Sequence, residues 1–135
     1  MSSEFPAEGM EATQIMVVSD TSASRRFYED VLGAEIEREY GSSVVMRFFG
    51  TWMLLVTGGD PTEDKPNVRF SPPADPDLVS HAITIRVPDC RAAHDVLIER
   101  GAKFLTPPVE SQYEVRAFFR DPDGHLIEIS ESKDG

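Results

Sequence analysis

Few residues in this chain have side chains suited to chemistry: three histidines, a single cysteine and a glutamate within an apolar stretch near the C-terminus. His94 falls inside a predicted helix and His125 directly after a predicted turn, so neither is expected to form a site. Cys90 begins a predicted helix, where the dipole can lower a thiol pKa, but an unreactive cysteine is the better interpretation. No Ser-His-Asp or Cys-His arrangement is recognisable. The remaining chemistry is that of His81 and Glu128, as metal ligands or, for the carboxylate, as a general base.

The acidic composition excludes several classes of partner. The 135 residues, 40% hydrophobic and 27% charged, suit one globular domain with its own core. Acidic residues outnumber basic ones 24 to 13, for a net charge of −11, whereas nucleic acids and anionic membranes require a basic surface. No stretch approaches the roughly 20 apolar residues of a membrane span, and the N-terminus lacks signal-peptide features. The single cysteine excludes an internal disulfide, so we expect a cytoplasmic protein. The acidic charge is compatible with a small-molecule partner.

The chain contains an internal repeat. In each half an apolar, β-branched stretch leads to an aspartate suited to cap a helix (Asp20, Asp89), and a glycine suited to end that helix follows (Gly33, Gly101). The first half predicts strands at 12–18, 34–40, 43–49 and 52–57 and a helix at 21–32. The second half predicts strands at 81–87, 102–106, 113–120 and 125–131 and a helix at 90–100, with an Asp-Pro-Asp-Gly turn before the last strand.

A proline-rich connection separates the two halves. Residues 58–80 hold too many prolines for a helix or a central strand. This connection is either a plain surface linker or a lid over a site. The predicted organisation is a flexible arm at 1–11, one domain at 12–131 made of modules 12–57 and 81–131, and a tail at 132–135.

Two motifs within this repeat resemble the vicinal oxygen chelate superfamily, which includes glyoxalase I, extradiol dioxygenases, fosfomycin-modifying enzymes and bleomycin-resistance proteins. The first is Val-Ser-Asp at 18–20 followed by Arg-Phe-Tyr-Glu-Asp-Val-Leu-Gly at 26–33. The second is Phe-Arg-Asp-Pro-Asp-Gly-His-Leu-Ile-Glu-Ile at 119–129. The resemblance implies an α+β fold in which two βαβββ modules form curled mixed sheets around a cavity, usually in a homodimer. Function does not follow from it, because this fold hosts many chemistries.

The resemblance also implies a test for a metal site. Enzymes of this superfamily generally hold one divalent metal with ligands from the first and last strands of each module. The matching positions here are Thr13, Ala82, Leu54 or Leu55, and Glu128. Only the last of these can coordinate a transition metal, and one carboxylate does not hold one. We therefore expect no metal and no cofactor.

A shifted register would restore one more ligand. Gln14 and His81 lie beside the expected positions. Strand alternation puts His81 on the same face as the apolar residues of 81–87, which should pack on the helices, and the repeat puts Gln14 on the equivalent face. A β-bulge would reverse this parity. The alternative hypothesis is therefore a metal-dependent lyase, isomerase or dioxygenase that uses Glu128 with His81.

Without a metal, the implied cavity becomes a ligand pocket. Alternation and family position give these ligand-binding candidates: Thr13, Phe48, Trp52, Leu54, Ala82, Thr84, Arg86, Arg116, Phe118 and Glu128. Aromatic rings would stack on a flat ligand and arginine would bind a carboxylate or phenolate, although an internal Glu–Arg pair is an equally good interpretation of the charges. We predict a metal-independent protein that sequesters an aromatic or cationic compound such as an antibiotic.

Overall fold

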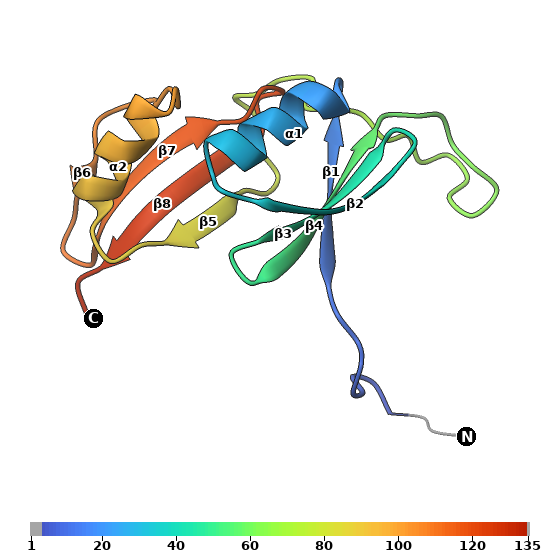
Figure 1. Cartoon of the computed structure of the whole chain (residues 1–135), viewed down its shortest axis with the longest axis horizontal. Coiled ribbons are helices and arrows are strands. Elements are labelled where there is room, and N and C mark those ends of the chain that lie inside the picture. Colours follow the sequence, from blue (N-terminus) through green and yellow to red (C-terminus); the bar gives the residue numbers. More distant parts are fainter. Residues whose placement is uncertain (1–3, 135) are drawn as a thin grey trace.

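The computed structural model describes residues 4–134 and confirms an α+β fold of two similar modules (Figure 1). The first module consists of β1 (Thr13–Val18), α1 (Thr21–Asp30), β2 (Glu35–Tyr40), β3 (Ser43–Phe48) and β4 (Thr51–Thr57). The second consists of β5 (Ile83–Arg86), α2 (Cys90–Glu99), β6 (Val109–Glu110), β7 (Glu114–Arg120) and β8 (Leu126–Ser132).

Each module forms one four-stranded mixed sheet with the same topology. The strand order is β1-β4-β3-β2 in the first sheet and β5-β8-β7-β6 in the second. In both sheets the first strand of the module pairs in parallel with the last, and the other pairs are antiparallel. The equal topology confirms that the sequence repeat is a structural repeat.

The predicted capping residues begin both helices. The Asp20 carboxylate accepts hydrogen bonds from the backbone N–H groups of Ser22 and Ala23, and the Asp89 carboxylate accepts one from Ala92. These bonds satisfy amide donors that the first turn of a helix leaves without partners. Gly33, at φ +73°, takes the left-handed conformation that ends the first helix.

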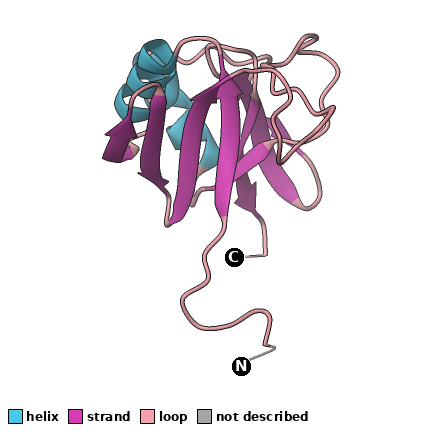
Figure 2. Ribbon diagram, turned by 90° about the vertical axis from the view of Figure 1, so that its right-hand side faces the viewer, coloured by secondary structure: helices cyan, strands magenta, loops and turns pink. Residues whose placement is uncertain are grey.

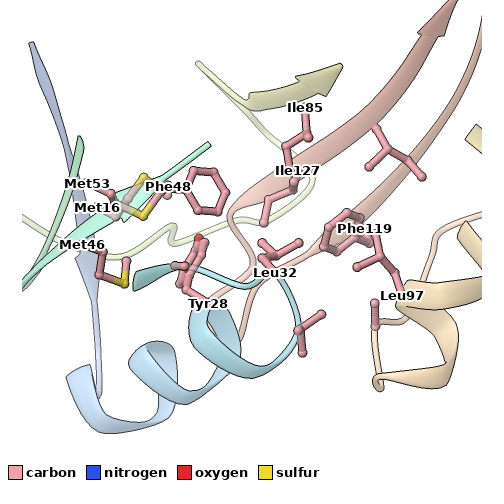
Figure 3. Close-up of a cluster of buried hydrophobic side chains, with 14 of the residues drawn as sticks. Met16, Tyr28, Leu32, Met46, Phe48, Met53, Ile85, Leu97, Phe119 and Ile127 are labelled. Carbon is pink, nitrogen blue, oxygen red and sulfur yellow. The ribbon is translucent and has the colours of Figure 1, made fainter. Parts of the chain in front are cut away.

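A continuous core lies between the helices and the two sheets (Figure 3). Tyr28 of α1 and Leu32, just after that helix, lie between the methionines of the first sheet and the Phe119–Ile127 side of the second. Tyr28 packs edge-on against Phe48, with ring centroids 5.7 Å apart. The first helix therefore packs against both modules, which joins them into one hydrophobic core.

Hydrogen bonds to the turn before β8 also join the modules. The buried Tyr28 hydroxyl donates to the Asp121 carboxylate at 2.8 Å. The Asp123 carboxylate accepts from the backbone and hydroxyl of Ser19, the latter at 2.7 Å. The His125 imidazole contacts the carbonyl oxygen of Val17 at 2.7 Å. The Asp-Pro-Asp-Gly turn thus links the two modules as well as the last two strands.

One of the predicted strands is absent. Residues 102–106 form no strand; only Phe104 bridges to Phe119, and the outer strand of the second sheet is the two-residue β6. Pro107 and Pro108 lack backbone donors, so the chain cannot pair continuously there. The buried side chains of α1 are Ser24 and Tyr28, both of which carry a hydroxyl.

The proline-rich connection lies at the end of the sheets opposite the N-terminal arm (Figures 1 and 2). Arg120 binds it by donating to the Asp77 carboxylate at 2.8 Å and to the Pro76 carbonyl. Residues 4–12 form no helix or strand, while residues 1–3 of the predicted arm and residue 135 of the tail lie outside the described part. Neither of the ten-residue helices described is long enough to span a bilayer.

Candidate functional site

Strand alternation gives each sheet an open face turned away from the helices. On the first sheet the register places Thr13 beside Trp52 and Ile15 beside Leu54 on this face, while their neighbours Met16, Met53 and Leu55 are buried in the core. Ile15 is 45% exposed although it belongs to a central apolar stretch. The open face of the first sheet is therefore an apolar, partly exposed surface.

The open face of the second sheet carries the charges. The register aligns Thr84, Glu128 and Phe118 in one row. Arg86, Ser130 and Arg116 form the next row. Side chains alternate between the two faces of a strand, so the sequence predicts that these residues share one face. The strand register agrees with this prediction.

Glu128 is the buried carboxylate of this face. Glu128 is only 8% exposed. One of its carboxylate oxygens accepts a hydrogen bond of 2.7 Å from the Thr84 hydroxyl. The other oxygen lies 3.9 Å from the Arg116 guanidinium, beyond hydrogen-bond distance. The carboxylate therefore has one directed partner and a weak ion pair, and its second oxygen keeps acceptor capacity.

A hollow of about 480 Å³ lies between the two sheets. It is lined by residues of the two modules: Gln14, Phe48, Phe49, Thr51, Trp52, Met53, Ile83, Thr84, Ile85 and Arg86. Beside it the Arg47 guanidinium lies over the Trp52 ring, 4.3 Å from the centroid. An aromatic wall with a few polar groups is the usual composition of a small-molecule pocket.

The structure brings together some of the predicted site residues and separates others. Trp52, Thr84 and Arg86 share the hollow, whereas Ala82 lies exposed before the start of β5. Phe48 also lines the hollow, but its side chain is buried on the helix side of β3, where it packs against Tyr28. Residues 43–49 have apolar side chains at both odd and even positions, so the sequence pattern did not show which face of this strand packs on the core.

Gln14 was missed because alternation assigned it to the packed face. It is exposed at the edge of the first sheet and lines the hollow. Its amide nitrogen lies 3.5 Å from Nδ1 of His81, whose ring in turn stacks at 6.4 Å on that of His125. A strand at a sheet edge can turn either face to solvent, so alternation alone does not decide burial there.

The donor set does not fit the divalent metal that the fold family implies. Glu128 contacts a threonine hydroxyl and an arginine, and a guanidinium cannot be deprotonated to coordinate a metal. His81 contacts Gln14 and His125, so it shares no partner with Glu128. Within residues 4–134 no group of three or more His, Cys, Asp or Glu lies close enough to hold an ion. We derive no chemical step through a metal.

Cys90 lies away from this site. Its side chain is fully buried in the core, and burial raises the pKa of the thiol above its usual value. Its backbone N–H donates to the Glu131 carboxylate at 2.9 Å. These features agree with the prediction of an unreactive cysteine.

A second, smaller hollow of about 180 Å³ lies under the proline-rich connection. Its walls come from residues 71–81 and 124–126, including His81 and His125, and it does not include Glu128, Arg86 or Trp52. The connection therefore covers the turn end of the second sheet and leaves the hollow between the sheets open.

Solved structures with this architecture come from several bacteria. An integron cassette protein from the mobile metagenome of V. cholerae is 22% identical over 93% of this chain and 96% of its own, with a TM-score of 0.69. TnmS3, an antibiotic binding protein from Streptomyces sp. CB03234, is 22% identical over 94% and 98%, with a TM-score of 0.67. The fosfomycin resistance protein FosX from Listeria monocytogenes is 15% identical over 94% and 95%, with a TM-score of 0.69.

Two βαβββ modules with a hollow between them define a class of α+β proteins made of paired modules. A sequence model of the Glyoxalase/Bleomycin resistance protein/Dioxygenase superfamily matches residues 11–129, so the chain belongs to this superfamily. At the identities given above, the solved structures establish the fold and leave the activity of this chain to its own residues.

Proposed function

We propose that this chain is a metal-independent binding protein that sequesters an aromatic small molecule, such as an antibiotic, in the hollow between its sheets. The observation that carries the proposal is the combination of an aromatic hollow with a Glu128 that has arginine and threonine neighbours in place of metal ligands. Protection from a toxic compound would then depend on affinity and slow release, without a reactive group.

The contacts of the rings favour an aromatic ligand over a cationic one. The arginines Arg47 and Arg116 already lie over Trp52 and Phe118, 4.3 Å and 5.4 Å from the ring centroids. A ligand cation would have to compete with these guanidinium groups for the rings. A flat, neutral or anionic ring can instead stack on the guanidinium plane.

We further propose that the protein acts as a homodimer. The open face of the first sheet exposes Ile15 and leaves Leu54 and Val56 half-buried. Contiguous apolar surface of this kind is typical of an interaction or ligand-binding site, and a second copy would close it over the ligand. Light scattering should give twice the chain mass, and Ile15→Asp should lower that mass.

The first test is a thermal-shift screen of flat aromatic compounds against the purified chain. A ligand at about one hundred times its Kd stabilises a protein by about 2.7 kcal/mol, which raises the Tm of a domain of this size by roughly 8 °C. Trp52 is the sole tryptophan, so its fluorescence reports occupancy of the hollow directly. Failure of a broad aromatic library to shift either signal would refute the proposal.

The competing hypothesis is a metal-dependent lyase, isomerase or dioxygenase that uses Glu128 with His81. Calorimetric titration with Ni²⁺, Mn²⁺, Zn²⁺ and Fe²⁺ separates the two. One tightly bound ion per chain that is lost in Glu128→Gln would favour the enzyme. No heat of binding up to millimolar metal is the result expected for a binding protein.

A further inference from the structure

A row of three side chains crosses the open face of the second sheet. Ser130 of the central strand β8 pairs in register with Arg86 of β5 on one side and with Arg116 of β7 on the other. Side chains opposite each other in neighbouring strands lie about 5 Å apart at Cβ. The hydroxyl therefore lies between two arginine side chains.

Ser130 is buried, yet its hydroxyl has no protein partner. The residue is 1% exposed, and its oxygen forms no hydrogen bond with any residue of 4–134. Buried polar groups are almost always paired, so each exception calls for an explanation. The neighbouring row shows the contrast, because there the Thr84 hydroxyl donates to Glu128 at 2.7 Å.

The two arginines also keep donors free. The side chain of Arg86 is exposed and forms no ion pair or hydrogen bond within the described residues. Arg116 lies 3.5 Å from Glu114 and 3.9 Å from Glu128, both longer than a hydrogen bond. Elsewhere Arg25 and Arg120 bind carboxylates at 2.6 Å and 2.8 Å.

This absence of partners is selective. The chain has 24 acidic residues against 13 basic ones, so an arginine side chain has many carboxylates available to it. Arg86 has no carboxylate partner within residues 4–134, and Arg116 has none within hydrogen-bond distance. With the Ser130 hydroxyl between them, these side chains form a set of donors with unused capacity. An oxyanion supplies the missing acceptors, because guanidinium groups bind carboxylates and phosphates through parallel hydrogen bonds.

We infer that Arg86, Ser130 and Arg116 form a subsite for an anionic group of the ligand, so that the compound bound is an aromatic acid. This inference rests on the proposed function, since it assigns one part of the same ligand site. Arg86 connects the two parts, because it belongs to this row and also lines the hollow beside Trp52. The ring of the ligand would lie in the hollow and its acidic group over the row.

The test compares three probes that differ in charge: 2-naphthoate, 2-naphthamide and 2-naphthylmethylammonium. Isothermal calorimetry at low salt should give a Kd for naphthoate that is at least about tenfold lower than for the neutral amide, since charge-assisted hydrogen bonds are about twice as strong as neutral ones. Added salt should narrow this difference, because the arginines are solvent-exposed.

Single substitutions test whether Arg86 and Ser130 cause the preference for the anionic probe. Arg86→Met should weaken naphthoate binding about tenfold and leave naphthamide binding unchanged. Ser130→Ala should weaken it a few-fold without lowering the urea midpoint, because it removes a hydroxyl that has no protein partner. Arg91→Met is the matched control, since Arg91 lies on α2, where it pairs with Glu110.

Other results would contradict the proposed anion subsite. Equal binding of naphthoate and naphthamide, or tighter binding of the ammonium probe, refutes it and leaves the proposed function standing. No binding of any probe at millimolar concentration refutes it as well, and the aromatic library screen then decides the proposed function independently. A lower urea midpoint for Ser130→Ala would show that the hydroxyl is structural.

Discussion

Tyr28→Phe tests the buried contact that joins the two modules. The substitution removes one hydroxyl and keeps the ring, so the packing against Phe48 is retained. Tyr28 and Asp121 are 0% and 5% exposed, and the hydroxyl donates to the carboxylate at 2.8 Å. The other oxygen of Asp121 accepts the backbone N–H groups of Asp123 and His125, each at 2.9 Å.

The expected loss at neutral pH is about 2 kcal/mol, because a hydrogen bond to a charged group contributes about 1.5–3 kcal/mol and no water replaces the hydroxyl in a packed core. With two backbone donors remaining, Asp121 stays partly satisfied, which keeps the loss below that of a fully unpaired charge. Urea unfolding followed by circular dichroism should therefore give a clearly lower midpoint with an unchanged m value.

The pH dependence provides a second test. Burial raises the pKa of the Asp121 carboxyl above its usual value, and burial likewise raises the pKa of Tyr28, which keeps the phenol neutral. Because the pKa of Asp121 is higher in the folded than in the unfolded state, protonation of Asp121 stabilises the folded state. This stabilisation is complete below the unfolded-state pKa and is lost as the pH rises through the folded-state pKa. Removing the Tyr28 donor raises the folded pKa further, so the loss should be larger at neutral than at acidic pH.

Tyr113→Phe is the matched control, because that hydroxyl is on a side chain that is 68% exposed and forms no side-chain hydrogen bond within residues 4–134. It should leave the urea midpoint unchanged. An equal midpoint for Tyr28→Phe and the wild type, or a loss that is the same at neutral and acidic pH, would refute the reasoning.

Three further predictions concern single residues. Cys90 should react with a thiol reagent only as fast as the protein unfolds, because its side chain is buried and its pKa raised; rapid labelling of the native chain would contradict this. Gly33→Ala should lower stability by about 1–2 kcal/mol because of its φ of +73°, whereas Gly59→Ala, at a position with open space and ordinary φ, should have almost no effect on the thermal midpoint. Glu128→Gln should strengthen naphthoate binding a few-fold by releasing Arg116, and weaker binding would show that the carboxylate itself contacts the ligand.

Local rules predicted much of this molecule correctly. Helix caps depend on one side chain and the next three amides, so Asp20 and Asp89 could be assigned from the sequence and the structure confirms both. The strand period of two likewise placed Thr84, Arg86 and Glu128 on one face, because apolar neighbours on β5 and β8 marked the other face unambiguously.

Local rules failed where prolines interrupted a repeat, and they did not separate core positions from ligand-lining positions in β3. Phe48 shares its face of β3 with Val44 and Met46, and all three are buried, whereas Arg47 on the other face is exposed. The strand expected at 102–106 is absent because the proline pair beyond it limits the edge of the sheet to β6.

The sequence by itself determined the repeat and the helix starts, both of which depend on residue type at a fixed spacing. Only the tertiary structure decided the hydrogen bond between Tyr28 and Asp121 and the burial of a Ser130 hydroxyl that has no partner among residues 4–134. These are properties of pairs that lie far apart in the chain, and no local pattern contains the register and the packing that bring them together or keep them apart.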